Sequence, residues 1–384
     1  MAGASSVAVA NGTVTIFLCG DVMLGRGVDQ ILPNPGDPSL RERQVRDARI
    51  YVELAESLNG SIPRPVDWAW PWGDAVELLD AAQCHARIVN LETSITASSD
   101  FAPGKGVHYR MNPANLPALT VVRPDACVLA NNHVLDFGHR GLLETLDVLS
   151  TAGLRIAGAG RSSAEAAAAT MVPIPGSSGR LIIVAFGTPS SGIPLSWAAR
   201  SEKAGVNLLT RFADAQADQL CGQARSVRRP GDVAIASAHW GSNWGYDIEL
   251  DQVRFAHRLI DGGFDLVHGH SSHHPRPLEV YRGKLILYGC GDLIDDYEGI
   301  RGHEQYRGDL RLLYLVRVDQ SSGQLLDLRM APLQARQLRL HRASAGDAEW
   351  LQGVLDTVSQ PFGARIDLDS DGLLAFHPKR GTTS

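Results

Sequence analysis

The segment DLVHGHSSHHP, at residues 265–275, places four histidines within seven positions of a chain that has 13 histidines in 384 residues. They are His268, His270, His273 and His274. The first two are two residues apart, so on an extended strand they share one face. Imidazole binds transition metals and carries protons near neutral pH. The cluster therefore predicts a metal site, an acid–base site, or both.

More polar side chains follow short apolar runs elsewhere in the chain. The runs VTIFLCGD, ARIVNLE, ACVLANNH and AIASAHW end in carboxylate, amide or imidazole groups. These groups are Asp21, Asn90, Glu92, Asn131, Asn132, His133 and His239. Ligand sites in open α/β sheets form outside the carboxyl ends of the strands, so we expect these ends to meet the histidine cluster. A buried core has no need of such a set.

The donor types predict the class of metal. Carboxylate, amide and imidazole groups without a thiolate suit Mn, Fe, Zn or Mg. The candidates outnumber the ligands of one tetrahedral ion. Two divalent ions roughly 4 Å apart, with a shared carboxylate, would use them all.

Elements of alternating type must position these groups. The apolar runs are short and buried in character, and helical patterns at residues 141–153 and 251–263 lie between them. This alternation predicts an α/β architecture. Near the end, residues 307–319 and 323–333 are typical of antiparallel strands, and residues 347–358 of a helix.

Residues 30–72 break the alternation, because they are rich in Pro, Gly and charge. They end in DWAWPWGD, which holds Trp68, Trp70 and Trp72. One interpretation is a loop pinned to the body by aromatic burial. The other is an aromatic, substrate-binding wall of a cleft, since long loops often carry function.

The remaining segments complete the domain prediction. Asp367, Asp369 and Asp371 match the first half of an EF-hand loop, but Pro378 stands where a bidentate Glu is required, so we expect a β-hairpin. We predict a flexible tail at 1–12 and a main domain at 13–340 with a loop insertion at about 30–72. A helix and hairpin extension follows at 341–384.

Composition excludes several classes. The net charge is −6, so no basic surface predicts a nucleic acid or membrane partner. The five cysteines are scattered, which argues against a disulfide framework and fits a reducing compartment. The first apolar run is too short for a signal peptide or membrane span. We expect a cytoplasmic protein, with the oligomeric state open.

Five motifs resemble those of a known family. GDVMLGR, NLETSIT, LANNHVLDFG, HWG and PLEVYRGKLILYGCGD occur in that order between about residues 14 and 300. Together they resemble the calcineurin-like metallophosphoesterases, and more narrowly their CapA-type branch of capsule and poly-γ-glutamate synthesis proteins. The resemblance implies a four-layer α/β/β/α fold, a β-sandwich flanked by helices, with a dinuclear metal site at the strand ends.

The resemblance also implies roles for single residues. His133 is the acid beside the ligand Asn132. Asp136 lies three residues further along the chain, and from that position we expect it to hydrogen-bond to His133. Glu92 is the expected bridging carboxylate, because Asn90 carries no charge. The metal ligands that the resemblance implies are Asp21, Glu92, Asn132, His239 and His270, and the strand face that His268 shares with His270 adds His268 to the predicted ligands.

Three positions depart from the family pattern. Met23 stands where the superfamily has a His, and GHSSHH replaces the usual GHHPH, so the partner of His270 is either His268 or His273. The usual Gly-Asn is Gly291-Asp292, which adds carboxylates near the site. CapA-type proteins are membrane-anchored, whereas we expect no anchor here.

Such a site supports several reactions. Epimerisation at Cα needs two titratable groups around the metals, and this chain has a surplus: His133, His273, His274, Asp292, Asp295 and Asp296. Soluble CapA-like proteins include the lasso peptide epimerases, which this chain resembles in length and motifs. We therefore predict a peptide epimerase first, acting on a precursor peptide through His133, His273 and Asp292. A hydrolase of a phosphoester or a poly-γ-glutamate-like polymer comes second, and a non-catalytic polymer-binding protein third.

Overall fold

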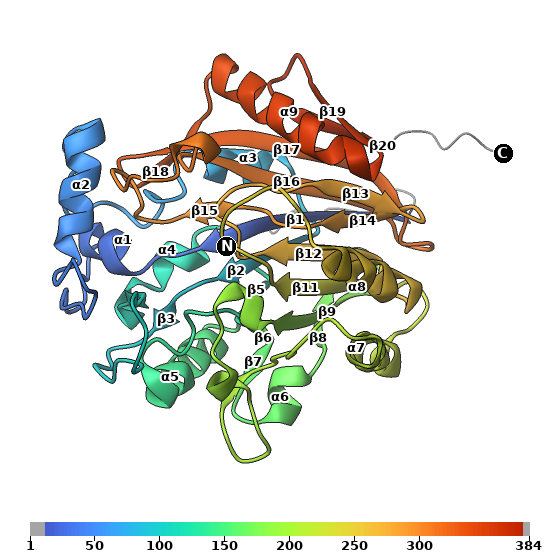
Figure 1. Ribbon diagram of the computed structural model, residues 1–384, viewed down its shortest axis with the longest axis horizontal. Helices are drawn as coiled ribbons and strands as arrows, with labels where there is room; N and C mark the ends of the chain where they lie inside the picture. Colours follow the sequence, from blue (N-terminus) through green and yellow to red (C-terminus); the bar gives the residue numbers. More distant parts are fainter. Residues whose placement is uncertain (1–11, 379–384) are drawn as a thin grey trace.

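Two β-sheets pack face to face at the centre of the computed structural model, which describes residues 12–378 (Figure 1). The larger sheet has the strand order β19-β20-β17-β16-β1-β2-β5-β6, with β15 beside β1 and β18 beside β17. Its strands are β1 (Thr13–Val22), β2 (Ala86–Leu91), β5 (Ala126–Val128), β6 (Arg155–Ala157), β15 (Asp292–Ile294), β16 (Leu310–Asp319), β17 (Leu325–Arg336), β18 (Arg339–Arg342), β19 (Ala364–Leu368) and β20 (Leu374–Pro378).

The smaller sheet has the order β13-β14-β12-β11-β9-β8. Strands β9, β11, β12 and β14 are mutually parallel, and β8 and β13 are antiparallel edges. Its strands are β8 (Thr170–Pro173), β9 (Arg180–Gly187), β11 (Val233–His239), β12 (Leu266–His270), β13 (Leu278–Tyr281) and β14 (Lys284–Leu287). Two short pairs lie outside both sheets: β3 (Ser94–Ile95) with β4 (Arg110–Met111), and β7 (Ala159–Gly160) with β10 (Gly205–Val206).

The central strands are apolar on both faces because each face meets a different core. In β9, Leu181 and Ile183 enter the core between the sheets, whereas Ile182 and Val184 pack beneath helices. Successive side chains of a strand point to opposite faces, so an unbroken apolar run fills both cores.

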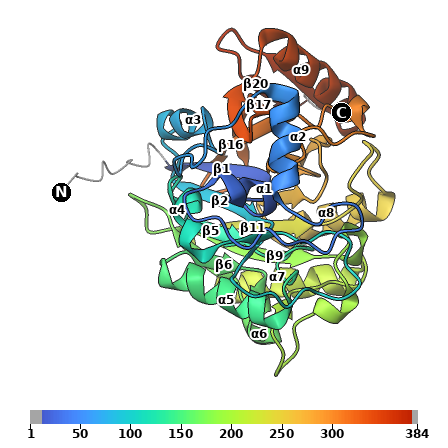
Figure 2. The ribbon, with the colours of Figure 1, turned by 90° about the vertical axis from the view of Figure 1, so that its left-hand side faces the viewer.

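Helices cover the outer face of each sheet (Figures 1 and 2). The helices from α1 to α5 share the core on the outer face of the larger sheet, and α7 and α8 cover the smaller one. The four-layer α/β/β/α prediction is therefore confirmed. The helices are α1 (Arg26–Ile31), α2 (Arg49–Asn59), α3 (Ala75–Ala81), α4 (Pro117–Thr120), α5 (Gly138–Thr151), α6 (Ser163–Ala167), α7 (Asp214–Val227), α8 (Leu250–Asp261) and α9 (Ala345–Ser359).

Most predicted elements occur where expected. The helical patterns correspond to α5, α8 and α9, and the two late strands are the antiparallel pair β16–β17. The prediction of an irregular loop over 30–72 is wrong at residues 49–59, which form α2. Tyr51, Val52 and Ala55 recur there at helical spacing and are buried, but the charged residues around them obscure the pattern.

The C-terminal segment joins the larger sheet through the pairing of β20 with β17. Its predicted hairpin is confirmed as β19–β20. The carboxylates of the EF-hand-like run are engaged by arginines: Arg329 pairs with Asp369 and Asp371 at 3.0 and 2.8 Å, and Arg365 with Asp367 at 2.8 Å. The predicted tail falls on residues 1–11, which lie outside the described part of the chain, and on Gly12. Within residues 12–378, no helix has the length and apolar character that crossing a membrane requires.

Candidate metal centre

The carboxyl ends of four parallel strands meet at one edge of the sandwich. His239 ends β11 and His270 ends β12, and the two are paired in register. Asp21 on β1 is paired with Asn90 on β2 and with Asp292 on β15. The topology rule for strand ends therefore brings together residues that lie up to 271 positions apart, as Asp21 and Asp292 do.

A β-bulge aims Asp21 at this edge. Leu18 faces the core between the sheets, so strict alternation would turn Asp21 away from it. The register of β1 against β2 shifts between these two residues, which re-aims the carboxylate. Gly20 lies within the shift, and a Cβ there would stand 1.5 Å from the carbonyl oxygen of Gly291. Only glycine fits this close backbone approach.

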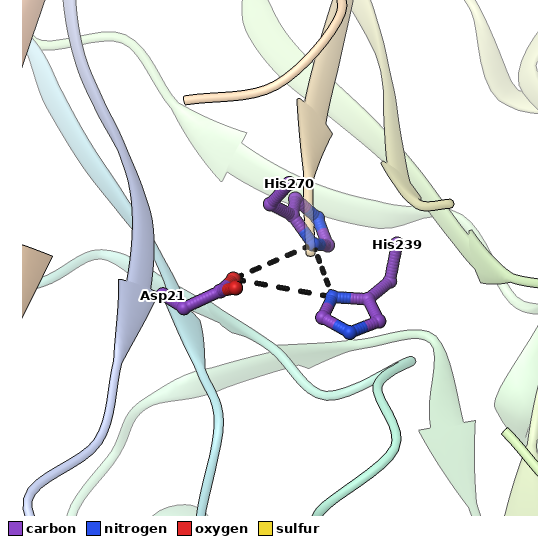
Figure 3. A group of neighbouring side chains, drawn as sticks. All are labelled: Asp21, His239 and His270. Carbon is purple, nitrogen blue, oxygen red and sulfur yellow. Dashed lines mark hydrogen bonds and ion pairs between the residues drawn. The ribbon is translucent and has the colours of Figure 1, made fainter. Parts of the chain in front are cut away.

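One group of donors consists of Asp21, His239 and His270 (Figure 3). The Nδ1 atoms of His239 and His270 lie 2.8 Å apart. Oδ1 of Asp21 lies 3.9 Å from Nδ1 of His239 and 4.0 Å from Nδ1 of His270. Burial lowers the pKa of both histidines. Their imidazoles are therefore neutral near pH 7 and offer lone pairs to a metal.

A second group of donors consists of Asp21, Glu92 and Asp292, whose oxygens all lie within 4.8 Å of one another. Burial and then the charge of Asp292 raise the pKa of Asp21 to about 7. Burial and the charges of Asp21 and Asp292 also raise the pKa of Glu92. Three buried carboxylates repel one another unless a cation joins them, so this donor set fits divalent metals. Asp21 belongs to both groups.

Three polar residues that sequence reasoning did not assign hold these donors in place. Nδ2 of Asn90 donates to Oδ1 of Asp21 at 2.5 Å. Nδ2 of Asn131 donates to the Leu91 carbonyl at 2.9 Å. The Ser237 hydroxyl lies 3.1 Å from Nε2 of His270. Ser237 stands out in the sequence as the one hydroxyl within the apolar run that precedes the β11 histidine.

The structure contradicts the prediction that His268 is a ligand. It shares a face with His270, as expected, but it lies one pleat deeper between the sheets. Its Nε2 is 2.7 Å from the Cys19 carbonyl and its Nδ1 is 3.0 Å from the Ser237 hydroxyl. His268 belongs to neither donor group.

Asn132 and His133 reach the centre from the loop after β5. Oδ1 of Asn132 lies 2.9 Å from Nε2 of His239. Nδ1 of His133 lies 2.6 Å from Asp136, and its Nε2 lies 3.8 Å from Glu92. Burial lowers the pKa of His133 to about 4, and the charge of Asp136 offsets only part of this effect. The predicted pairing of Asp136 with His133 is present.

Lys105 joins this pair, and sequence reasoning missed it. Its Nζ donates to Asp136 at 2.5 Å, lies 3.2 Å from Nδ1 of His133, and contacts the Asn132 carbonyl. The available signal was the tight sequence PGKG, because glycines on both sides let a lysine approach other backbone closely.

The predicted surplus of acid–base groups is smaller than the sequence indicated. Asp295 pairs with Arg311 at 2.6 Å, and Asp296 forms an ion pair with the buried Arg26. His274 is buried, with its ring stacked on Tyr306 at 4.5 Å. None of these three residues belongs to either donor group.

His273 and Asp292 form an ion pair, with Nδ1 of the imidazole 3.0 Å from the carboxylate. Burial lowers the pKa of His273, but the charge and hydrogen bond of Asp292, together with the charges of Asp21 and Asp295, outweigh burial, so the pKa is raised overall. Asp292, expected as a catalytic group, lies among the candidate metal donors instead.

A cleft of about 840 Å³ opens over the centre. The part of the cleft nearest the donor groups is lined by Glu92, Asn132, His133, His273 and Asp292. Its outer part is formed by α2, the segment 297–311 and the end of β17.

The three tryptophans predicted to bind substrate do not line this cleft. Trp72 is fully buried and its Nε1 donates to the Ala118 carbonyl at 2.7 Å. Nε1 of Trp70 donates to the Gln337 carbonyl at 3.0 Å, and Trp68 packs against the same core. The prediction of a cleft wall is wrong, because burial of the rings pins this segment to the body.

Comparisons with known proteins identify the family of the chain. The sequence profile of the bacterial capsule synthesis protein family PGA_cap matches residues 15–297. A "Probable polyglutamine synthesis accessory protein" of Mycobacterium tuberculosis (strain CDC 1551 / Oshkosh) is 54% identical over 97% of this chain and 98% of its own length. The "PGA biosynthesis protein CapA" of Bacillus subtilis (strain 168) is 26% identical over 72% of this chain and 62% of its own length.

Among solved structures, a 5'-nucleotidase precursor from Thermus thermophilus aligns with a TM-score of 0.47 and 16% identity. The alignment covers 91% of this chain and 59% of that one. The profile match spans most of the chain, and the mycobacterial relative matches it almost from end to end. The chain therefore belongs to the PGA_cap family of bacterial capsule synthesis proteins.

Proposed function

We propose that the protein is a divalent-metal-dependent hydrolase that acts on an anionic substrate, with a glutamate-type polymer as the substrate class. The observation that carries the proposal is the pair of donor groups that share Asp21 on the floor of a large cleft. His133 lies beside them, with its Nε2 toward Glu92.

The metal ligands follow from the two groups. Asp21, His239 and His270 would hold one ion, and Asp21, Glu92 and Asp292 the other. Asp21 would then be the shared carboxylate, in place of the Glu92 that the sequence suggested. Two divalent ions at these donors would supply Lewis acidity and neutralise the negative charge of the reacting group.

His133 is the proposed proton-transfer residue. Asp136 accepts a hydrogen bond from Nδ1, which leaves Nε2 to take or give a proton in the cleft. Tyr109 stacks on the imidazole with ring centroids 3.8 Å apart and limits its rotation. His273, held by Asp292, orients that carboxylate and balances its charge.

Two features support an anionic polymer. Relatives are named for polyglutamine synthesis and PGA biosynthesis. Arg301 and Arg336 line the outer cleft, are exposed, and form no ion pair within residues 12–378. Free guanidinium groups bind carboxylates in bidentate geometry, so both are available to successive negative groups of a long substrate.

Peptide epimerisation, the first prediction from the sequence, has weaker support. It needs two titratable groups on opposite faces of the substrate, and of the six candidates only His133, His273 and Asp292 line the cleft. Asp292 lies among the metal donors and is paired with His273. His133 is then the one candidate that is free to transfer a proton to or from the substrate. A single proton-transfer group suits hydrolysis better than a reaction that needs two bases.

The test compares three substrates with the protein loaded with Mn²⁺. Poly-γ-glutamate is followed by size-exclusion chromatography, an aryl phosphodiester by released phenol, and a peptide in heavy water by mass spectrometry. We expect hydrolysis of the polymer, loss of it in His133→Asn, and its retention in a control variant of the exposed His139, His139→Gln.

Release of the phenol without cleavage of the polymer would show that the protein is a hydrolase but that it cleaves a phosphoester instead of the polymer. Deuterium at Cα in an uncleaved peptide would contradict the proposal and favour the epimerase. No cleavage of either substrate by protein that carries metal would also contradict it.

A further inference from the structure

The hydroxyls of Tyr109 and Tyr297 contact each other in the wall of the cleft. We infer that the hydroxyls of Tyr109 and Tyr297 form a donor site for a negatively charged oxygen of the substrate. The inference rests on the proposed function, because the oxygen concerned is the one that becomes more negative as a bond is hydrolysed.

Packing places the pair between the two cleft histidines. The ring of Tyr109 stacks on His133 with centroids 3.8 Å apart. The ring of Tyr297 meets His273 edge-on, with centroids 5.3 Å apart. The two Oη atoms contact each other across the cleft wall, and both residues line the cleft. The hydroxyl pair therefore spans the gap between groups that flank the metal donors.

The buried Arg26 packs against both rings. The guanidinium carbon of Arg26 lies 4.9 Å from the ring centroid of Tyr109 and 5.8 Å from that of Tyr297. Its charge is balanced by Asp296 and Glu42, at 2.5 and 3.0 Å. Because Arg26 is only 3% exposed and is fixed by these two ion pairs, it gives the tyrosine rings a rigid packing surface. Donors that do not reorganise are the effective ones for a charge that develops during reaction.

Counting hydrogens shows that one donor is left over. Each hydroxyl has one hydrogen to donate, and the contact between the two uses one. Within residues 12–378, neither Oη has another hydrogen-bond partner. Burial raises the pKa of both tyrosines, so both hydroxyls keep their hydrogens at neutral pH. The remaining O–H is available to a ligand in the cleft.

The neighbourhood selects the chemistry of that ligand. Besides burial, the charge of Glu92 raises the pKa of both tyrosines, and that of Asp292 raises the pKa of Tyr297, so the hydroxyls lie within the field of the carboxylate group. An anion held by metal ions at those carboxylates would present oxygens to the pair. A tetrahedral oxyanion suits this position, whether it comes from a phosphoester or from an amide under attack.

The test measures binding of inorganic phosphate to the Mn²⁺-loaded full-length protein by calorimetry. Tyr109→Phe, Tyr297→Phe and the double variant keep the rings and remove only the hydroxyls. We expect the double variant to bind phosphate about ten- to a hundred-fold more weakly, the usual loss for a hydrogen bond to a charged group. Each single variant should lose less, because the remaining hydroxyl can donate. Tyr306→Phe, whose ring packs on His274 outside the cleft lining, is the matched control.

Metal content and thermal unfolding of each variant establish that the centre and the fold are intact. Phosphate binding in the double variant equal to that of the wild type would overturn the inference, as would absence of phosphate binding by the loaded wild type. Hydrolysis is assayed separately on the wild type. Phosphate binding that depends on the two tyrosines, without hydrolysis of any substrate, would support the donor site and contradict the proposed hydrolase activity.

Discussion

Replacing Asp21 with Asn tests the centre most directly, because Asp21 belongs to both donor groups. The change removes one negative charge and keeps the size of the side chain. The new Oδ1 can still accept the hydrogen bond that Asn90 donates to Asp21 at 2.5 Å. The Ser271 backbone N–H, which donates to Oδ2 of Asp21 at 3.2 Å, loses its acceptor in the variant, so the pH dependence of the effect, rather than its size at one pH, reports on the charge.

The magnitude for metal-free protein follows from the pKa. Burial and the charge of Asp292 raise the pKa of Asp21 from 3.8 to about 7. Below about pH 4 the carboxyl is protonated in both folded and unfolded states and has no net effect. Between about pH 4 and 7 the folded state keeps a proton that the unfolded state has lost, so the free energy of unfolding falls as pH rises. The full loss above pH 7 is about 4 kcal/mol, at about 1.4 kcal/mol for each pH unit.

In a chelating buffer, Asp21→Asn should therefore be more stable than the wild type. The difference should be small near pH 4 and grow to about 4 kcal/mol at pH 8. Added Mn²⁺ at 100 times its Kd should stabilise the wild type by about 2.7 kcal/mol, because only the folded state binds it, and should reduce the difference at pH 8 to about 1 kcal/mol. The variant lacks the shared ligand and gains little from metal.

Urea unfolding at pH 5 and pH 8, with chelator or with Mn²⁺, measures both effects, and elemental analysis counts the metal. Asp218→Asn, at an exposed surface ion pair, is the control and should shift neither quantity. A variant that is destabilised equally at both pH values in chelator, and that binds as much metal as the wild type, would refute the reasoning.

Three further predictions concern single residues of the centre and its surroundings. His133→Asn should keep its metals and lose turnover by about 10²–10⁴-fold, the usual contribution of an acid–base group, whereas His139→Gln keeps full activity; equal turnover in both would remove His133 from the mechanism. His270→Ala should lose most bound metal in elemental analysis, whereas His268→Asn should retain it. His268→Asn should instead lower the free energy of unfolding by about 1–3 kcal/mol, because the groups that hydrogen-bond to His268 lose their partner. Metal loss in His268→Asn and metal retention in His270→Ala would restore His268 as a ligand. Trp72→Ala should cost about 3–5 kcal/mol of stability in urea unfolding and leave the KM of folded protein unchanged, so a raised KM at full stability would revive a role in binding.

The layers of the fold were predictable because they depend on local pattern. Apolar runs of strand length alternating with helical patterns indicate α/β architecture, and the positions of α5, α8 and α9 followed from spacing alone. Helix α2 was missed because its buried face is narrow, at Tyr51, Val52 and Ala55, within a charged segment. So weak a hydrophobic pattern indicates a helix only when the surface that the helix covers is known.

The candidate donors were also predictable as a set, because a general rule brings the carboxyl ends of parallel strands to one edge. Asp21, Glu92, His239 and His270 do meet there. The rule says nothing about depth along a strand or about local bulges. It therefore could not separate His268 from His270, which differ by one pleat.

The sequence by itself determined which chemical groups this protein holds at its strand ends and the sandwich that carries them, because both follow from residue type and short-range periodicity. Only the tertiary structure decided their roles. A bulge in β1 makes Asp21 common to both donor groups, Arg26 pairs with Asp296 from the other end of the chain, and Arg311 pairs with Asp295. Burial pins Trp72 in the core instead of the cleft. These outcomes depend on contacts between segments remote in sequence, whose geometry no local pattern encodes.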